Sequence, residues 1–168
     1  MEKEKIPHQL KTVNNLGEEA SQAIAKALNP LVADAFALYV KTKSFHWHLY
    51  GAHFRDYHLL FDEQAAQIFE TIDVLAERVR KLGGLTVRSI GHISQLQTIK
   101  DDNDTCVAPL EMIKRLMEDN LHVCQQMRKA HEVCSKYKDI ATTSLLEEFI
   151  DHTERRTWFL FEIQAEQG

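Results

Sequence analysis

The sequence predicts an all-α protein in which four long helices form a bundle. The chain has 168 residues but only 6 glycines and 3 prolines, too few for the many turns of a β-sandwich or barrel. Its apolar residues recur at steps of three and four along four long stretches, which is the period of an α-helix. With 44% hydrophobic and 27% charged residues, the composition is that of one ordinary soluble domain.

The first helical pattern covers residues 29–49. Its apolar positions are Leu31, Val32, Ala35, Phe36, Leu38 and Tyr39. Asn29 and Pro30 resemble an N-cap followed by a first-turn proline. Residues 17–28 are also helix-like, so Pro30 either begins a second helix or kinks one long helix. The sequence leaves both alternatives open.

The second helix is predicted over residues 54–82, where the apolar repeat is the most sustained of the chain. Gly83-Gly84 provides a C-terminal stop. A third helix is expected from Pro109 to about residue 136. The fourth is expected to begin at residues 143–144, because Ser144 and Glu147 have the spacing of a capping box.

The lengths of the connections predict the topology. Residues 50–53 and 137–142 are short connections, so each pair of helices that they join should be antiparallel. Residues 84–104 are a much longer connection, whose extended length of roughly 66 Å exceeds the roughly 43 Å of the second helix. The chain can therefore return along the whole bundle, in the up-down-down-up topology typical of ferritin-like proteins. Residues 89–96 are predicted to form a short extra helix inside this crossover.

Charge limits the classes of partner. The formal net charge is −5, which excludes the broad basic surface of a dedicated nucleic-acid binder. We expect residues 1–16 to form a flexible N-terminal tail and residues 17–168 to form the bundle domain. The tail mixes both signs of charge: Lys3, Lys5, Lys11, Glu2 and Glu4. Direct DNA binding is therefore expected to be weak.

The sequence indicates a soluble protein with reduced cysteines. No uncharged run approaches the roughly 18 to 20 apolar residues that cross a bilayer, so no membrane association is expected. The predicted location is the cytoplasm, with association with the nucleoid as an alternative. Cys106, Cys124 and Cys134 are odd in number and lack CxxC spacing, so we expect free thiols, mostly in the core.

Residues that commonly bind metals gather at the junction of the first two helices. Four of the nine histidines lie within thirteen residues: His46, His48, His53 and His58. On the second helix, His58 and Asp62 are four residues apart, as are Asp73 and Glu77, and all four share one stripe. A solvated charged face is the alternative. The mixture of imidazole and carboxylate favours iron, manganese or zinc, and His46 can point at the N-terminal end of the stripe.

The spacing of the stripe predicts a site between two subunits. Asp62 and Asp73 are separated by about 16 Å along one helix, whereas the ligands of one metal lie about 2 Å from it. One chain therefore cannot close both pairs on one ion. When two copies of this helix pack antiparallel about a two-fold axis, one register brings His58 opposite Glu77 and Asp62 opposite Asp73. The symmetry then generates a second, identical site.

This constellation resembles the Dps family of mini-ferritins. The matching residues are Phe45-His46-Trp47, His58, Asp62, Asp73 and Glu77, with further similarity at residues 141–146 and 156–158. The resemblance implies a ferritin-like fold and a homo-oligomer, a hollow cage of twelve subunits built from two-fold dimers. Such a cage oxidises ferrous iron, preferentially with hydrogen peroxide, stores the ferric mineral and protects against oxidative damage. Iron is the expected metal, and zinc is a second candidate for the same donors.

The resemblance also implies roles for single residues. His46, His58 and Asp62 would come from one subunit, and Asp73 and Glu77 from its partner. Trp47 would lie beside the iron, where its ring can give up an electron, with an interface or core anchor as the alternative. His48 and His53 lie outside the family pattern. We expect them to be surface residues, with accessory metal binding as the alternative.

Acidic residues near the start of the fourth helix resemble those that line iron-uptake pores at the three-fold axes of this family. They are Glu147, Glu148 and Asp151. Ser144 stands where several relatives carry another acid. A solvated acidic face is the alternative interpretation.

Two other functions compete with this hypothesis. A classical ferritin with a di-iron site inside one bundle would need Glu-x-x-His motifs on two helices, and only Asp119-x-x-His122 comes near. An architectural DNA-compacting protein with a weak metal site would need a stronger basic tail.

Overall fold

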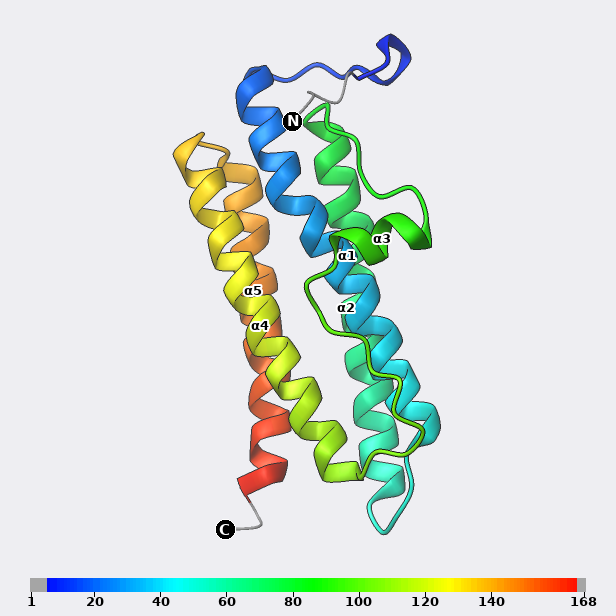
Figure 1. Ribbon diagram of the computed structural model, residues 1–168. Helices are drawn as coiled ribbons and strands as arrows, with labels where there is room; N and C mark the ends of the chain where they lie inside the picture. Colours follow the sequence, from blue (N-terminus) through cyan, green and yellow to red (C-terminus); the bar gives the residue numbers. More distant parts are fainter. Residues whose placement is uncertain (1–5, 166–168) are drawn as a thin grey trace.

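The predicted all-α four-helix bundle is confirmed by the computed structural model, which describes residues 6–165. The elements are η1 (His8–Leu10), α1 (Glu18–His48), α2 (Phe54–Lys81), α3 (Ile90–Leu96), α4 (Pro109–Lys136) and α5 (Ile140–Ala165). Figure 1 shows α1 and α2 as one antiparallel hairpin and α4 and α5 as a second one beside it. The long crossover makes α2 and α4 run in the same direction.

α1 is one continuous helix of 31 residues, so Pro30 lies inside it and does not begin a new helix. The N-cap interpretation of Asn29 is therefore wrong. Its side-chain amide donates to the carbonyl oxygen of Leu85 at 2.8 Å, which ties α1 to the crossover. Buried residues on both sides of the proline, such as Leu28 and Leu31, keep the helix continuous through packing that offsets the missing N–H group.

α5 begins at Ile140, so the prediction of a start at residues 143–144 is wrong. The residue before the helix, Asp139, accepts hydrogen bonds from the backbone N–H and the hydroxyl of Thr142. Arg78 of α2 donates to the same Asp139 carboxylate at 2.7 Å. This buried aspartate is a stronger N-cap than the exposed Ser144, because a distant arginine holds it in place.

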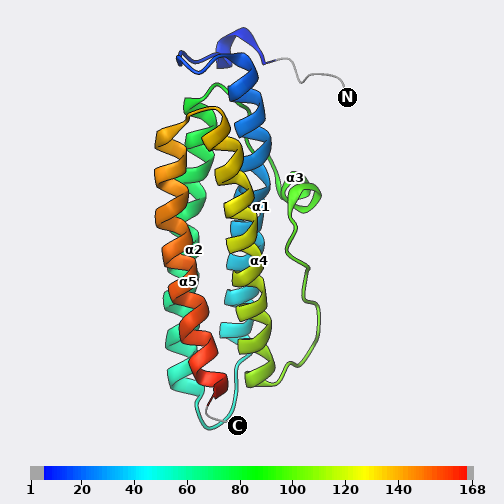
Figure 2. The same cartoon turned by 90° about the vertical axis from the view of Figure 1, so that its left-hand side faces the viewer.

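The crossover runs along the outside of the bundle and contains the short helix that was predicted (Figure 2). The side chain of Ser89 caps α3 by accepting from the N–H of His92 at 3.1 Å. The fully buried Asp34 of α1 then holds the chain: its carboxylate accepts from the N–H of Ile99 at 3.0 Å and from the N–H and hydroxyl of Thr98. This contact fixes the crossover against α1.

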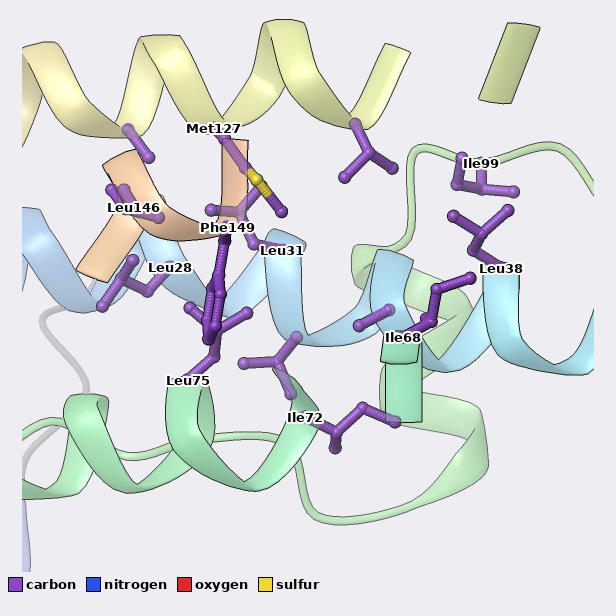
Figure 3. Packing of buried hydrophobic residues seen from close by; sticks show 14 of the residues in the cluster. Leu28, Leu31, Leu38, Ile68, Ile72, Leu75, Ile99, Met127, Leu146 and Phe149 are labelled. Carbon is purple, nitrogen blue, oxygen red and sulfur yellow. The ribbon is translucent and has the colours of Figure 1, made fainter. Parts of the chain in front are cut away.

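The core lies between the two hairpins (Figure 3). The residues labelled there come from all four long helices and the crossover: Leu28, Leu31, Leu38, Ile68, Ile72, Leu75, Ile99, Met127, Leu146 and Phe149. Within residues 6–165, α1 is the helix that is long and apolar enough to cross a bilayer. Half of that apolar stretch is buried inside the bundle, as expected of a core helix.

The N-terminal segment contacts the end of α2. Arg80 donates to the carbonyl oxygen of Leu10 at 2.7 Å, and the Asn14 side chain donates to that of Leu82 at 3.0 Å. Lys3 and Lys5 of the predicted tail lie outside the described residues.

The three cysteines are free thiols, as predicted. Cys124 and Cys134 are buried in the core, whereas Cys106 is exposed. Burial raises the pKa of Cys134 to about 12, which keeps this thiol protonated and unreactive at neutral pH.

We expect Asp34→Ala to lower the thermal unfolding midpoint by roughly 4–8 °C, because the buried N–H of Ile99 and the N–H and hydroxyl of Thr98 lose their acceptor. Calorimetry at matched subunit concentration measures this change. Asp34→Asn keeps one carbonyl acceptor and should lose less. An Asp34→Ala midpoint within 1 °C or so of the wild type would show that the contact does not stabilise the fold.

Candidate metal site

His46 and His58 stack on each other where α1 ends and α2 begins. Their ring centroids are 3.7 Å apart, with 21° between the planes. Nδ1 of His46 lies 2.8 Å from the carbonyl oxygen of His58, and Nδ1 of His58 lies 3.0 Å from that of His46. A carbonyl oxygen can only accept, so both Nδ1 atoms carry the proton. In the neutral form of each ring, the lone pair therefore lies on Nε2, the atom available for a metal.

Asp62 lies one helical turn beyond His58 and adds an oxygen donor. Its Oδ1 is 3.9 Å from Nε2 of His46, and its side chain is 57% exposed. The Lys43 ammonium donates to the same oxygen at 2.6 Å. This hydrogen bond is the main cause that lowers the pKa of Asp62, so the carboxylate is ionised at neutral pH. The fold thus brings together the three ligands predicted to come from one subunit.

Asp73 and Glu77 lie apart from this cluster. Both are exposed on α2, about three turns beyond Asp62. Glu77 forms an ion pair of 3.1 Å with Lys81, one turn further along the helix. Within residues 6–165, no group of three or more His, Cys, Asp or Glu side chains is arranged to hold a metal ion. One subunit therefore presents two separate and incomplete sets of donors.

The stripe of donors lies in an exposed apolar surface. On α2, Leu59 and Phe69 are 53% and 54% exposed, and they interleave with the acidic residues at helical spacing. On α1, Val40 and Trp47 are also exposed, on either side of Lys43. Apolar patches with polar residues among them mark interaction surfaces. Apart from Trp47, neither these residues nor Lys43 was singled out from the sequence, although their spacing from the ligands was visible there.

The other candidate residues singled out at this end of the bundle, Trp47, His48 and His53, are on the surface. Trp47 is 65% exposed, so the core-anchor alternative is wrong within one chain. His48 and His53 are exposed, as predicted. His48 is engaged through Nδ1, which is 2.7 Å from the carbonyl oxygen of Ser44.

The acidic residues predicted for the pore, Glu147, Glu148 and Asp151, are exposed on α5. Glu147 lies 2.9 Å from Nε2 of His131 on α4. Their role in a pore stays a prediction.

The interior of the bundle does not support the alternative of a di-iron site within one chain. Asp119 pairs with Lys41 at 2.6 Å, and His122 contacts the hydroxyl of Thr98 at 2.7 Å, so each half of the Asp-x-x-His motif has a structural partner. Arg156 is buried between the helices and donates to Asn120 at 3.0 Å. Burial lowers the pKa of Arg156 to about 10, so it remains a cation that repels metal ions.

Comparison with known proteins gives one consistent result. Residues 25–166 match the ferritin-like domain family. The chain is 30% identical to the DNA protection during starvation protein of Brevibacillus brevis, covering 83% of this chain and 93% of the relative. DpsC from Streptomyces coelicolor superposes with a TM-score of 0.88 at 30% identity, covering 92% and 90% of the two chains. The Dps protein from Vibrio cholerae, described as a member of the ferritin-like diiron-carboxylate superfamily, has a TM-score of 0.84 at 26% identity, covering 91% and 97%.

We expect His58→Ala and Asp62→Ala to abolish binding of a divalent metal without loss of helix, because both side chains lie at the surface end of the stripe. Calorimetric titration with Zn²⁺, a redox-inactive probe, measures the binding, and circular dichroism measures the helix content. Asp56→Ala is the matched control, because Asp56 is an exposed acid in the first turn of the same helix. Equal Zn²⁺ binding by all three variants and the wild type would remove these residues from the site.

Proposed function

Because the chain belongs to the Dps family of ferritin-like proteins, we propose that it is a ferroxidase that oxidises Fe(II) and stores the ferric product in a hollow cage. The observation that carries this proposal is the cluster of His46, His58 and Asp62. Two imidazoles with free Nε2 atoms and one ionised carboxylate form a mixed nitrogen and oxygen set that suits iron. The cluster reaches the surface at Asp62, whose side chain is 57% exposed, and ferrous ions would approach from there.

The complete site would form between two subunits. The three clustered donors lie about three helical turns from Asp73 and Glu77 on α2. A two-fold axis between antiparallel copies of α2 would bring the pairs together twice, once at each end of the interface. The exposed apolar residues Leu59 and Phe69 support this assembly, because they would be buried by it. Six such dimers would build a cage of twelve subunits.

The residues of the site would have different roles in the oxidation of iron. The imidazoles of His46 and His58 would hold the ferrous ion, and the carboxylates would offset the extra positive charge of the ferric product. Hydrogen peroxide is the proposed oxidant: two ferrous ions each give one electron to one peroxide molecule, which takes up two protons and yields two waters. Trp47, which is exposed on α1, would supply an electron to a reactive oxidant before that oxidant escapes.

Two further proposals concern the entry of ferrous ions into the cage and the location of the protein in the cell. Glu147, Glu148 and Asp151 would attract ferrous ions at a pore, since exposed carboxylates concentrate cations. The net charge of −5 makes direct DNA binding weak, which argues against an architectural protein. We propose a cytoplasmic protein that limits oxidative damage by removing ferrous iron and peroxide together.

Subunit mixing tests whether the site is shared. One variant lacks His58 and Asp62, and another lacks Asp73 and Glu77. Each pure variant should be nearly inactive in peroxide-driven Fe(II) oxidation. After dissociation, mixing and reassembly, random pairing makes about half of the dimers mixed, and one of the two sites in each mixed dimer combines intact donors. Roughly a quarter of all sites should therefore recover.

The controls are the two pure variants carried through the same reassembly, with mixing verified by native mass spectrometry. Verified mixed assemblies that oxidise iron no faster than the pure variants would refute a shared site.

A further inference from the structure

Lys43 occupies a special position beside the donor cluster. It lies on α1, one turn before His46, and its side chain is only 17% exposed. Its ammonium contacts Oδ1 of Asp62 at 2.6 Å, the same oxygen that faces Nε2 of His46 at 3.9 Å. The positive charge of the lysine therefore sits on the carboxylate oxygen that a bound metal ion would use.

When a divalent cation and this ammonium share one oxygen, their repulsion weakens the binding of the cation. The charges repel at short distance, and the repulsion is strongest where water is partly excluded. The Trp47 ring gives the ammonium another place to lie, because its centroid is already 6.0 Å from Nζ and an aromatic face attracts a cation. Movement of Lys43 from Asp62 towards Trp47 would open the carboxylate.

We propose that Lys43 is a displaceable counter-cation, which neutralises Asp62 while the site is empty and must leave when a metal ion binds. This inference rests on the proposed function. In the proposed dimer, Asp62 would face two carboxylates of the partner subunit, and the ammonium would reduce their mutual repulsion. Lys43 would thereby stabilise the empty interface and lower the affinity of the site for metal.

Lys81 provides a comparison within the same chain. Its ammonium lies 3.1 Å from Glu77, a member of the other ligand pair. Both side chains are exposed, Lys81 to 60% and Glu77 to 58%. Exposed pairs one turn apart on a helix contribute little, because solvent screens them. The affinity should therefore depend on Lys43 much more than on Lys81.

The test is a calorimetric titration with Zn²⁺ of the assembled wild type and of Lys43→Met, Lys43→Arg and Lys81→Met. We expect Lys43→Met to bind Zn²⁺ about tenfold more tightly, a difference of about 1.4 kcal/mol. Lys43→Arg should bind more weakly than the wild type, because a guanidinium holds a carboxylate with two hydrogen bonds. Lys81→Met should change the affinity by less than about twofold.

Two results would overturn the inference. One is a Zn²⁺ affinity of Lys43→Met equal to or weaker than that of the wild type. The other is an equal gain in affinity for Lys81→Met, which would mean that the net charge, and not the position of Lys43, sets the affinity. Failure of the proposed function is distinguishable, because Asp62→Ala would then bind Zn²⁺ as tightly as the wild type. If Lys43→Met does not assemble, amine labelling of the wild type decides. Labelling of Lys43 relative to the exposed Lys26 should rise when Zn²⁺ is added, and an unchanged or lower ratio overturns the inference.

Discussion

The reciprocal hydrogen bonds between His46 and His58 are the interaction on which the candidate site depends. α1 ends at His48, so the carbonyl of His46 is one of the last four in the helix, which lack a partner within it. Nδ1 of His58 donates to that carbonyl oxygen, and Nδ1 of His46 on α1 donates in turn to the carbonyl oxygen of His58 on α2. The two bonds close the α1–α2 hairpin and place a proton on Nδ1 of both rings. The same contacts thus hold α1 against α2 and direct the Nε2 atoms to the candidate metal site.

Much of the fold could be predicted because its signals are local. The apolar repeat and Pro109 located α2 and α4 to within a residue of their observed ends. The wrong start of the last helix and the question left open at Pro30 have non-local causes. Asp139 is the N-cap of α5 because Arg78, 61 residues away in sequence, binds it. Pro30 is tolerated inside α1 because neighbouring helices bury the residues around it, and no short pattern shows that packing.

Only part of the candidate site could be predicted from the sequence. Helical spacing placed His58 and Asp62 on one face, and His46 does lie at its end. Lys43 was missed because a lysine one turn before a histidine carries no signal until the packing of α1 on α2 is known. The exposed apolar residues Leu59 and Phe69 follow the same stripe as the acids. Their alternation with ligand residues was a signal for an interface that could have been used.

We propose that iron binds between two subunits, with donors from both. Anomalous diffraction at the iron edge, from crystals soaked with Fe(II) without oxygen, tests this proposal. We expect an iron peak near Nε2 of His58 and the Asp62 carboxylate of one subunit, with Asp73 or Glu77 of the partner subunit completing the site. A peak inside one bundle, near Asp119 and His122, would contradict it.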